Sequence, residues 1–215
     1  TSTVVEMGEP RRAAVQSERS TNSALDLVDV AGQEEARFAL EIAAAGGHHL
    51  LLEGPPGAGK TMLAERLPSI LPPLSDRTAL EATAIRSVTT AGGSVTSLVR
   101  TPPFQAPHHS STMASIIGGG SGVARPGAAS MAHGGVLFMD EAPEFDRRVL
   151  DALRQPLESR QVELHRTVSS VTYPAAFQLV LASNPCPCGW DDDSGRRCQC
   201  TSIQRRRYSS RLSGP

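Results

Sequence analysis

Apolar residues along the chain recur with two spacings, one typical of helices and the other typical of buried strands. Residues 34–45 follow the helical period, and Gly46-Gly47 is expected to end that helix. Residues 50–52 are consecutive leucines, which predict a short buried strand. Residues 62–67 predict a second helix, which Pro68 should stop.

Buried-strand patterns return in the second half of the chain. Residues 136–139 and 177–182 are apolar runs, each followed by polar residues. A helix is predicted from about residue 146 to 157, and the alternation over residues 161–173 predicts a β-hairpin. Residues 72–135 are rich in Gly, Ser, Thr and Pro, and their periodicity is too weak to assign elements. Together these patterns predict an α/β fold around a parallel sheet.

The domain organisation follows from where these patterns begin. Residues 1–24 are polar and have no sustained period, so we interpret them as a linker or a poorly ordered arm. Residues 25–215 carry all the predicted elements, and their length is typical of one globular domain. No internal repeat is visible.

Composition and charge exclude several classes of protein. The 215 residues include 22 acidic and 21 basic side chains, giving a net charge of −1, which excludes a globally basic nucleic-acid coat and an acidic tail. The chain is 39% hydrophobic without an apolar run long enough to span a membrane, and residues 1–20 lack the apolar core of a secretory signal. We therefore expect a soluble, cytoplasmic protein with no membrane partner.

Lysine occurs once in the chain, at Lys60, and every other basic residue is an arginine. Residues 54–61 around it match the phosphate-loop pattern G-x-x-x-x-G-K-[ST], with these members: Gly54, Pro55, Pro56, Gly57, Ala58, Gly59, Lys60 and Thr61. Glycines allow successive N–H groups to turn toward one anion, and the helix that follows adds its dipole. The Lys60 ammonium is expected at the β- and γ-phosphates of ATP, and the Thr61 hydroxyl at Mg²⁺. An ordinary Gly/Pro turn is the alternative.

Two acids and an amide at strand ends complete this candidate site. Asp140 and Glu141 follow the apolar run 136–139, where one carboxylate can hold Mg²⁺ and a second can polarise the attacking water. We assign Asp140 to the metal and Glu141 to the water, although such a pair alone would more simply begin a helix. Asn184 follows the next strand and can orient that water or detect the γ-phosphate, or it can form a turn before Pro185.

All four cysteines of the chain lie in one loop, residues 186–200. Cys186, Cys188, Cys198 and Cys200 form a C-x-C-x₉-C-x-C pattern. Four clustered thiols are suited to a tetrahedral Zn²⁺ site, although C-x-C pairs are tighter than the usual C-x₂₋₄-C spacing. Reduced free thiols and a redox role are the alternatives.

Other polar residues have less specific interpretations. His108-His109 lacks a nearby third ligand, and adjacent side chains in a loop are not expected to share one face, so a structural or solvent-facing role is predicted. Met113, Ile116 and Ile117 are predicted to be core residues. Residues 194–215 contain six arginines and no acid, and these arginines can form a solvated face, contact DNA phosphates or contact the nucleotide of a neighbouring subunit.

A set of sequence blocks resembles the magnesium-chelatase-like AAA+ ATPases, and within them the competence-related ComM/YifB branch. The blocks are residues 29–33, 41–48, 54–61, 106–109, 118–120, 134–141, 153–158 and 184–189. The resemblance covers residues 26–215. It implies a P-loop NTPase fold of three layers, α/β/α, that binds ATP and Mg²⁺ and acts as a homo-oligomeric ring, expected to be a hexamer.

The same resemblance implies a DNA motor that hydrolyses ATP and promotes branch migration in recombination and natural transformation. Residues near 92–125 would form an insertion in the second helix, and residues 160–177 a hairpin before the sensor strand, both facing a central pore. Candidate DNA contacts are Arg160, Arg166, Arg205 and Arg206. A magnesium-chelatase motor subunit and a nucleotide-gated scaffold without turnover are the alternatives.

Proteins of this family also carry an N-terminal domain that resembles a protease fold, an arginine finger and a helical lid. The arginine finger lies just beyond a Ser-Gly-Pro segment such as residues 213–215. The chain is therefore expected to be the α/β core of a longer protein, without the lid and weakly active alone.

Overall fold

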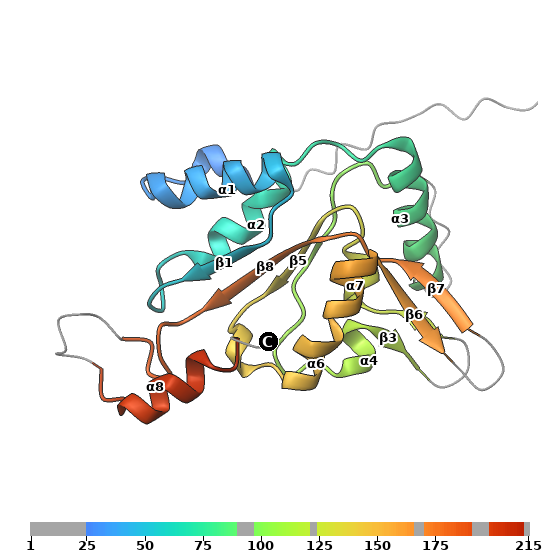
Figure 1. Ribbon diagram of the computed structural model, residues 1–215. Helices are drawn as coiled ribbons and strands as arrows, with labels where there is room; N and C mark the ends of the chain where they lie inside the picture. The colour runs from blue at the N-terminus through green and yellow to red at the C-terminus, as the bar shows by residue number, and fades with distance from the viewer. Residues whose placement is uncertain (1–24, 90–96, 121–123, 166–169, 191–197, 213–215) are drawn as a thin grey trace, which may run out of the picture.

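The computed structural model describes residues 25–89, 97–120, 124–165, 170–190 and 198–212. Its centre is a sheet of four strands, β1 (Leu50–Glu53), β8 (Gln178–Ser183), β5 (Val136–Met139) and β2 (Phe104–Gln105), in that spatial order. Every neighbouring pair is parallel. The α/β fold with a parallel sheet is therefore as predicted, and the carboxyl ends of the strands share one edge (Figure 1).

Alternate residues of β5 face two different hydrophobic cores, which makes the fold three-layered. Val136 and Phe138 pack with α1 (Glu34–Gly46) and α2 (Lys60–Ile70). Leu137 and Met139 pack on the opposite face. There they meet side chains of α4 (Met113–Ile116), α5 (Ala128–Met131) and α6 (Arg147–Ala152). Figure 1 shows α1 and α2 on one side of the sheet and α4 and α6 on the other.

The predicted end of α1 is confirmed, whereas the predicted end of α2 is wrong. As expected, α1 stops at its glycines, because Gly47 takes a left-handed backbone with φ 65°. The prediction that Pro68 stops the next helix is wrong, since α2 continues to Ile70 with Pro68 inside it. Proline removes one N–H donor, but the buried residues Leu63 and Leu67 hold α2 against the sheet, so the helix continues.

Two further elements differ from the predictions. The helix expected over residues 146–157 is divided into α6 and α7 (Arg154–Ser159). Pro156 has no N–H for the carbonyl of Ala152, which accounts for the break at Leu153. Strand β1 alternates between partly buried and exposed residues, and Leu51 is 51% exposed, because β1 is the edge strand of the sheet. The prediction of a fully buried strand there is wrong.

Residues 72–135, whose pattern alone predicted no element, contain α3 (Asp76–Thr89), the short helices α4 and α5, and three short strands. Part of the region near residues 92–125, for which an insertion is expected, supplies β2 to the central sheet. It also supplies β3 (Gly118–Gly119), which pairs with β4 (Arg125–Pro126). Of the three apolar residues assigned to the core there, Ile116 is fully buried and Ile117 packs beside it, whereas Met113 is 37% exposed.

The predicted β-hairpin is present as β6 (Gln161–His165) and β7 (Ser170–Pro174), paired antiparallel. Figure 1 shows this hairpin at one end of the molecule and α8 (Ser202–Ser209) at the other. Two 3₁₀ helices, η1 (Leu27–Asp29) and η2 (Ala142–Glu144), complete the elements. Within the described ranges, no helix is long and apolar enough to cross a membrane. The arm predicted at residues 1–24 lies outside them.

Candidate functional site

The carboxyl edge of the sheet gathers most of the residues singled out in the sequence. Residues 54–59 follow β1, Asp140 and Glu141 follow β5, and Asn184 follows β8, which lies between those two strands. All of these strand ends border one cavity of about 450 Å³. Its lining residues are Pro56, Gly57, Ala58, Gly59, Lys60, Thr61, Met62, Asp140, Glu141, Ser183 and Asn184. Gly54 and Pro55 contribute backbone carbonyls beside it.

The loop before α2 has a backbone that requires glycine. Gly57 and Gly59 have φ values of 78° and 83°, in the left-handed region. Gly59 is also the N-cap of α2, so the helix begins directly at Lys60 and its amino end opens on the cavity. Unpaired N–H groups and the positive end of the helix dipole at such a position attract an anion.

Lys60 is held by the loop from which it projects. Its Nζ donates hydrogen bonds to Gly54 O at 2.7 Å, Pro55 O at 3.1 Å and Asn184 Oδ1 at 3.1 Å. Desolvation lowers the pKa of Lys60, and the nearby carboxylates of Asp140 and Glu141 oppose that shift. The ammonium thus joins the loop after β1 to the amide after β8.

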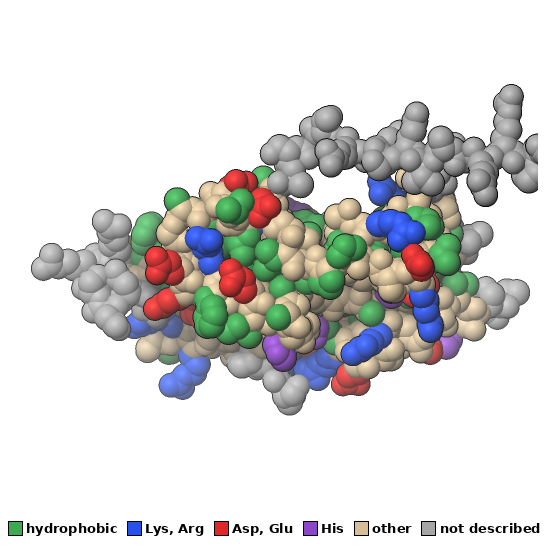
Figure 2. All heavy atoms as spheres, turned by 90° about the horizontal axis from the view of Figure 1, so that it is seen from above, with side chains coloured by type: hydrophobic (Ala, Val, Ile, Leu, Met, Phe, Trp, Pro, Cys, Tyr) green, Lys and Arg blue, Asp and Glu red, His purple; other side chains and the backbone are tan. Residues whose placement is uncertain are grey.

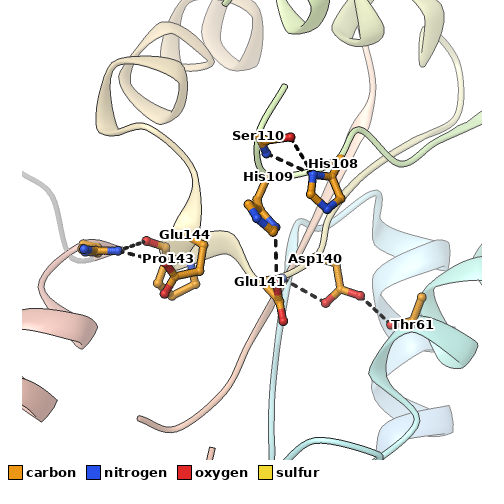
Figure 3. A network of polar contacts seen from close by, with 9 residues as sticks. Thr61, His108, His109, Ser110, Asp140, Glu141, Pro143 and Glu144 are labelled. Atoms are coloured by element: carbon orange, nitrogen blue, oxygen red, sulfur yellow. Dashed lines mark hydrogen bonds and ion pairs between the residues drawn. The ribbon is translucent and has the colours of Figure 1, made fainter. Parts of the chain in front are cut away.

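Thr61 and Asp140 form a pair of oxygen ligands. Thr61 Oγ1 donates to Asp140 Oδ2 at 2.7 Å, and the other carboxylate oxygen, Oδ1, accepts from the Glu141 N–H at 2.9 Å (Figure 3). A hydroxyl beside a carboxylate, next to a phosphate-binding loop, is the donor set that Mg²⁺ prefers. The residues present therefore fit that ion.

His109 approaches Glu141 from the loop after β2. Its Nδ1 lies 3.3 Å from Glu141 Oε2, and the His108 ring packs against the His109 ring, with centroids 4.0 Å apart and the planes tilted by 35°. Figure 3 shows the two rings beside each other, with His109 next to Glu141 and Ser110 hydrogen-bonded to His108. The prediction that adjacent histidines cannot share a face is wrong, because this loop brings the two rings together. A structural or solvent-facing role agrees with the structure, since His108 is exposed and His109 is partly buried beside Glu141.

Sequence reasoning also missed Gln33. Its side chain donates from Nε2 to Ala58 O at 3.0 Å and thereby supports the phosphate loop from the start of α1. Gln33 has a left-handed backbone with φ 53°. Neither feature has a local sequence signal, since the contact joins residues that are far apart in the chain.

The predicted cysteine and arginine sites lie outside the cavity. The four cysteines, Cys186, Cys188, Cys198 and Cys200, are free thiols, and their sulfur atoms all lie within 4.8 Å of one another. Arg160 is exposed before β6, whereas Arg205 and Arg206 are exposed on α8 at the other end of the molecule. Arg166 falls outside the described residues. The structure thus divides the candidate DNA contacts between two places.

The face of the molecule shown in Figure 2 has no large patch of only positive or only negative side chains. Acidic, basic and apolar side chains are interspersed over the described part of that face. This agrees with the net charge of −1. On this face, local arginines rather than a broad basic surface are therefore the candidates for contact with DNA phosphates.

A parallel sheet with a phosphate loop after β1 and a carboxylate pair after β5, with β8 between these two strands, defines a P-loop NTPase fold of the AAA+ class. The chain belongs to the family described as magnesium chelatase, subunit ChlI, which matches residues 26–215. Membership of the AAA+ class implies the use of ATP and Mg²⁺.

The chain is also similar to named relatives and, in fold, to a solved structure. The chain is 55% identical to "Uncharacterized protein YifB" of Escherichia coli over 88% of its own length, and 48% identical to "Competence protein ComM" of Haemophilus influenzae over 91%. It spans 37% and 38% of those two proteins, well under half of each. In a structure of the complex between magnesium chelatase subunits BchI and BchD, one chain aligns with a TM-score of 0.57 at 23% identity, covering 73% of this chain and 53% of that one.

Proposed function

We propose that the protein is the ATP-hydrolysing motor core of a ring-forming DNA translocase that promotes branch migration in recombination and natural transformation. The observation that carries the hydrolytic part is the convergence of Lys60, Asn184 and the Thr61–Asp140–Glu141 chain of contacts on one cavity. A cation for phosphate, oxygen ligands for a metal and a carboxylate for water are all present there.

In this proposal the loop residues bind and orient the triphosphate. Lys60 exchanges its bonds to the Gly54 and Pro55 carbonyls for the β- and γ-phosphates, and the amino end of α2 supports the same charge. Thr61 and Asp140 would hold Mg²⁺, which would neutralise charge on the phosphates. Zn²⁺, predicted from the cysteines, takes no part in this step.

Glu141 and Asn184 act on the attacking water. The Glu141 carboxylate orients the water and accepts its proton, as a general base. Asn184 already bonds Lys60 through Oδ1, so its amide is within reach of the γ-phosphate position and can report whether that phosphate is present. The residue that activates water and the residue that detects the γ-phosphate thus follow two neighbouring strands, β5 and β8.

DNA as the substrate of the motor is supported by the relatives rather than by the cavity. One relative is named a competence protein, and arginines are exposed just before β6, at Arg160, and on α8, at Arg205 and Arg206. We assign Arg160, Arg166, Arg205 and Arg206 to DNA phosphates, in a hexameric cytoplasmic ring of identical subunits that binds branched or single-stranded DNA. An arginine supplied by a neighbouring subunit would complete the hydrolytic site.

A magnesium-chelatase motor is the second candidate, favoured by the aligned structure of the chelatase subunit complex. It would use the same ATPase site on a different partner. Pull-down of the full-length protein with branched DNA and with chelatase subunits separates the two. If the protein retains chelatase subunits but does not retain branched DNA, the second candidate is favoured.

The test of the first candidate is the DNA-stimulated ATPase rate of the full-length protein. Lys60→Ala should lose the stimulated rate, because the triphosphate loses its only ammonium. Arg77→Ala is the matched control, since that exposed cation lies on α3, outside the cavity lining. Equal rates for Lys60→Ala and the wild type would contradict the assignment.

A further inference from the structure

The cysteine cluster beside the candidate ATP site has the geometry of a metal centre. Cys186 Sγ lies 3.3 Å from Cys188 Sγ and 3.7 Å from Cys198 Sγ, and Cys188 Sγ lies 3.7 Å from Cys198 Sγ. Cys200 Sγ is within 4.8 Å of the other three. Four sulfurs around one Zn²⁺ at about 2.3 Å occupy a tetrahedron with edges of about 3.8 Å.

The same distances argue against disulfides. A bonded pair has an S–S separation of about 2.05 Å, far shorter than any separation in the cluster. The four thiols therefore lie close together without forming disulfide bonds. An all-thiolate, four-fold set is typical of zinc among common protein metals.

The two halves of the cluster come from different elements. Cys186 and Cys188 directly follow Asn184 at the end of β8, whereas Cys198 and Cys200 directly precede α8, whose capping box begins at Thr201. An ion bound by all four would join the strand end of the candidate ATP site to the start of α8.

Helix α8 lies mostly at the surface. Of its eight residues only Tyr208 is buried. Just beyond the helix, Arg211 Nη1 donates to Pro143 O at 2.8 Å. Figure 1 shows α8 standing apart from the helical layers of the sheet. A helix this short is marginal in water without an anchor.

We propose that Cys186, Cys188, Cys198 and Cys200 bind one Zn²⁺ as thiolates and that this ion fastens α8 to the end of β8. Binding displaces the thiol protons to solvent. The centre also contacts the phosphate loop, because Gly189 packs so closely on Pro56 that a Cβ at Gly189 would lie 2.7 Å from the proline ring. Zinc in this place is structural and does not depend on the proposed ATPase activity.

The first test is metal analysis of protein purified without chelators or added metal. Elemental analysis should find about one zinc per chain, released when an organomercurial blocks the thiols. A protein without bound metal whose four thiols all react freely in the native state would overturn the proposal. Iron accompanied by visible absorbance would also overturn it, since the cluster would then hold an iron–sulfur centre.

The second test asks whether the ion fastens α8. Hydrogen exchange of residues 202–209 should become at least about tenfold faster after zinc removal, because structural zinc contributes folding free energy, while β5 keeps its protection. The double variant Cys198→Ser, Cys200→Ser should match the metal-free protein. Gln199→Ala, an exposed residue between the two ligands, is the control and should keep both zinc and protection. Unchanged exchange of α8 after complete zinc removal would refute the fastening role.

Discussion

His109 Nδ1 lies 3.3 Å from Glu141 Oε2 and thereby places a histidine from the loop after β2 on the carboxylate that ends β5. Glu141 has a left-handed backbone with φ 51°, which turns it away from the strand direction. The carboxylate that we assign to the attacking water is thus paired from the side by His109.

Replacement of this histidine tests whether the pair restrains hydrolysis. His109→Ala should raise the DNA-independent ATPase rate by up to about fivefold, because a partly exposed ion pair is worth at most about 1 kcal/mol. Steady-state ATPase assays with and without DNA measure the effect. His108→Ala, which keeps the Glu141 contact, is the control. A rate for His109→Ala equal to that of the wild type would show that the pair imposes no restraint.

Gly59 tests the backbone of the phosphate loop. Gly59→Ala puts a Cβ about 2.9 Å from Gln33 Nε2 at a left-handed φ of 83°. The left-handed conformation alone costs about 1–2 kcal/mol, and the displaced loop should abolish nucleotide binding. Chemical denaturation and binding of a fluorescent ATP analogue are the measurements.

Gly47→Ala is the matched variant for Gly59→Ala. Gly47 shares the left-handed backbone, with φ 65°, but has no atom near its added Cβ. It should lose a similar amount of stability and still bind nucleotide. Loss of binding in both variants would mean that instability, rather than loop geometry, explains the effect.

The pair between Glu81 and His133 predicts a pH dependence of stability. A hydrogen bond from Arg77 and another from His133 hold the pKa of Glu81 below its ordinary value, so the ionised form stabilises the fold. That contribution is complete above the unfolded pKa, about 4.3, and is lost as the pH falls through the lower folded value. In the wild type, protonation of Glu81 at low pH should lower the free energy of unfolding by at most about 1 kcal/mol, and Glu81→Gln should not show this loss. Identical acid titrations of stability for both proteins would contradict it.

Zinc removal should also weaken nucleotide binding, if both proposals hold. The cysteine loop contacts the phosphate loop through Gly189 and Pro56, and Asn184 precedes the first cysteine by two positions. Coupling between sites of this kind is typically about fivefold or more in affinity. Titration of an ATP analogue into zinc-loaded and metal-free protein measures it. Equal affinities of the two proteins for the ATP analogue would show that the zinc centre is not coupled to the ATP site. The structural role of zinc would still be tested by the hydrogen-exchange experiment.

The parts of the site that the sequence predicts are those carried by short local patterns. The loop around Lys60 and the acids after residues 136–139 each follow an apolar strand, and parallel strands end at one edge of a sheet. His109 could not be placed in this way, because β2 is only two residues long and has no periodicity of its own. Its role emerges only from the pairing of β2 with β5.

The missed and misassigned helices have a similar cause. Helix α3 buries Ala79, Ala82 and Ile85, and two alanines give too weak an apolar pattern to predict a helix. The two prolines acted in opposite ways, since α2 continues past Pro68 whereas the helix before Pro156 breaks. Packing on the sheet decides between these outcomes, and packing is not visible in a local sequence window.

The central claim, that this site hydrolyses ATP, is tested most directly by single-turnover hydrolysis with the Glu141→Gln variant of the full-length protein. The variant should bind ATP as tightly as the wild type, because Lys60 and Thr61 are unchanged. Its hydrolysis should be slower by about 100-fold or more, since it lacks the general base. Wild-type hydrolysis in the variant, or no hydrolysis in either protein, would contradict the account.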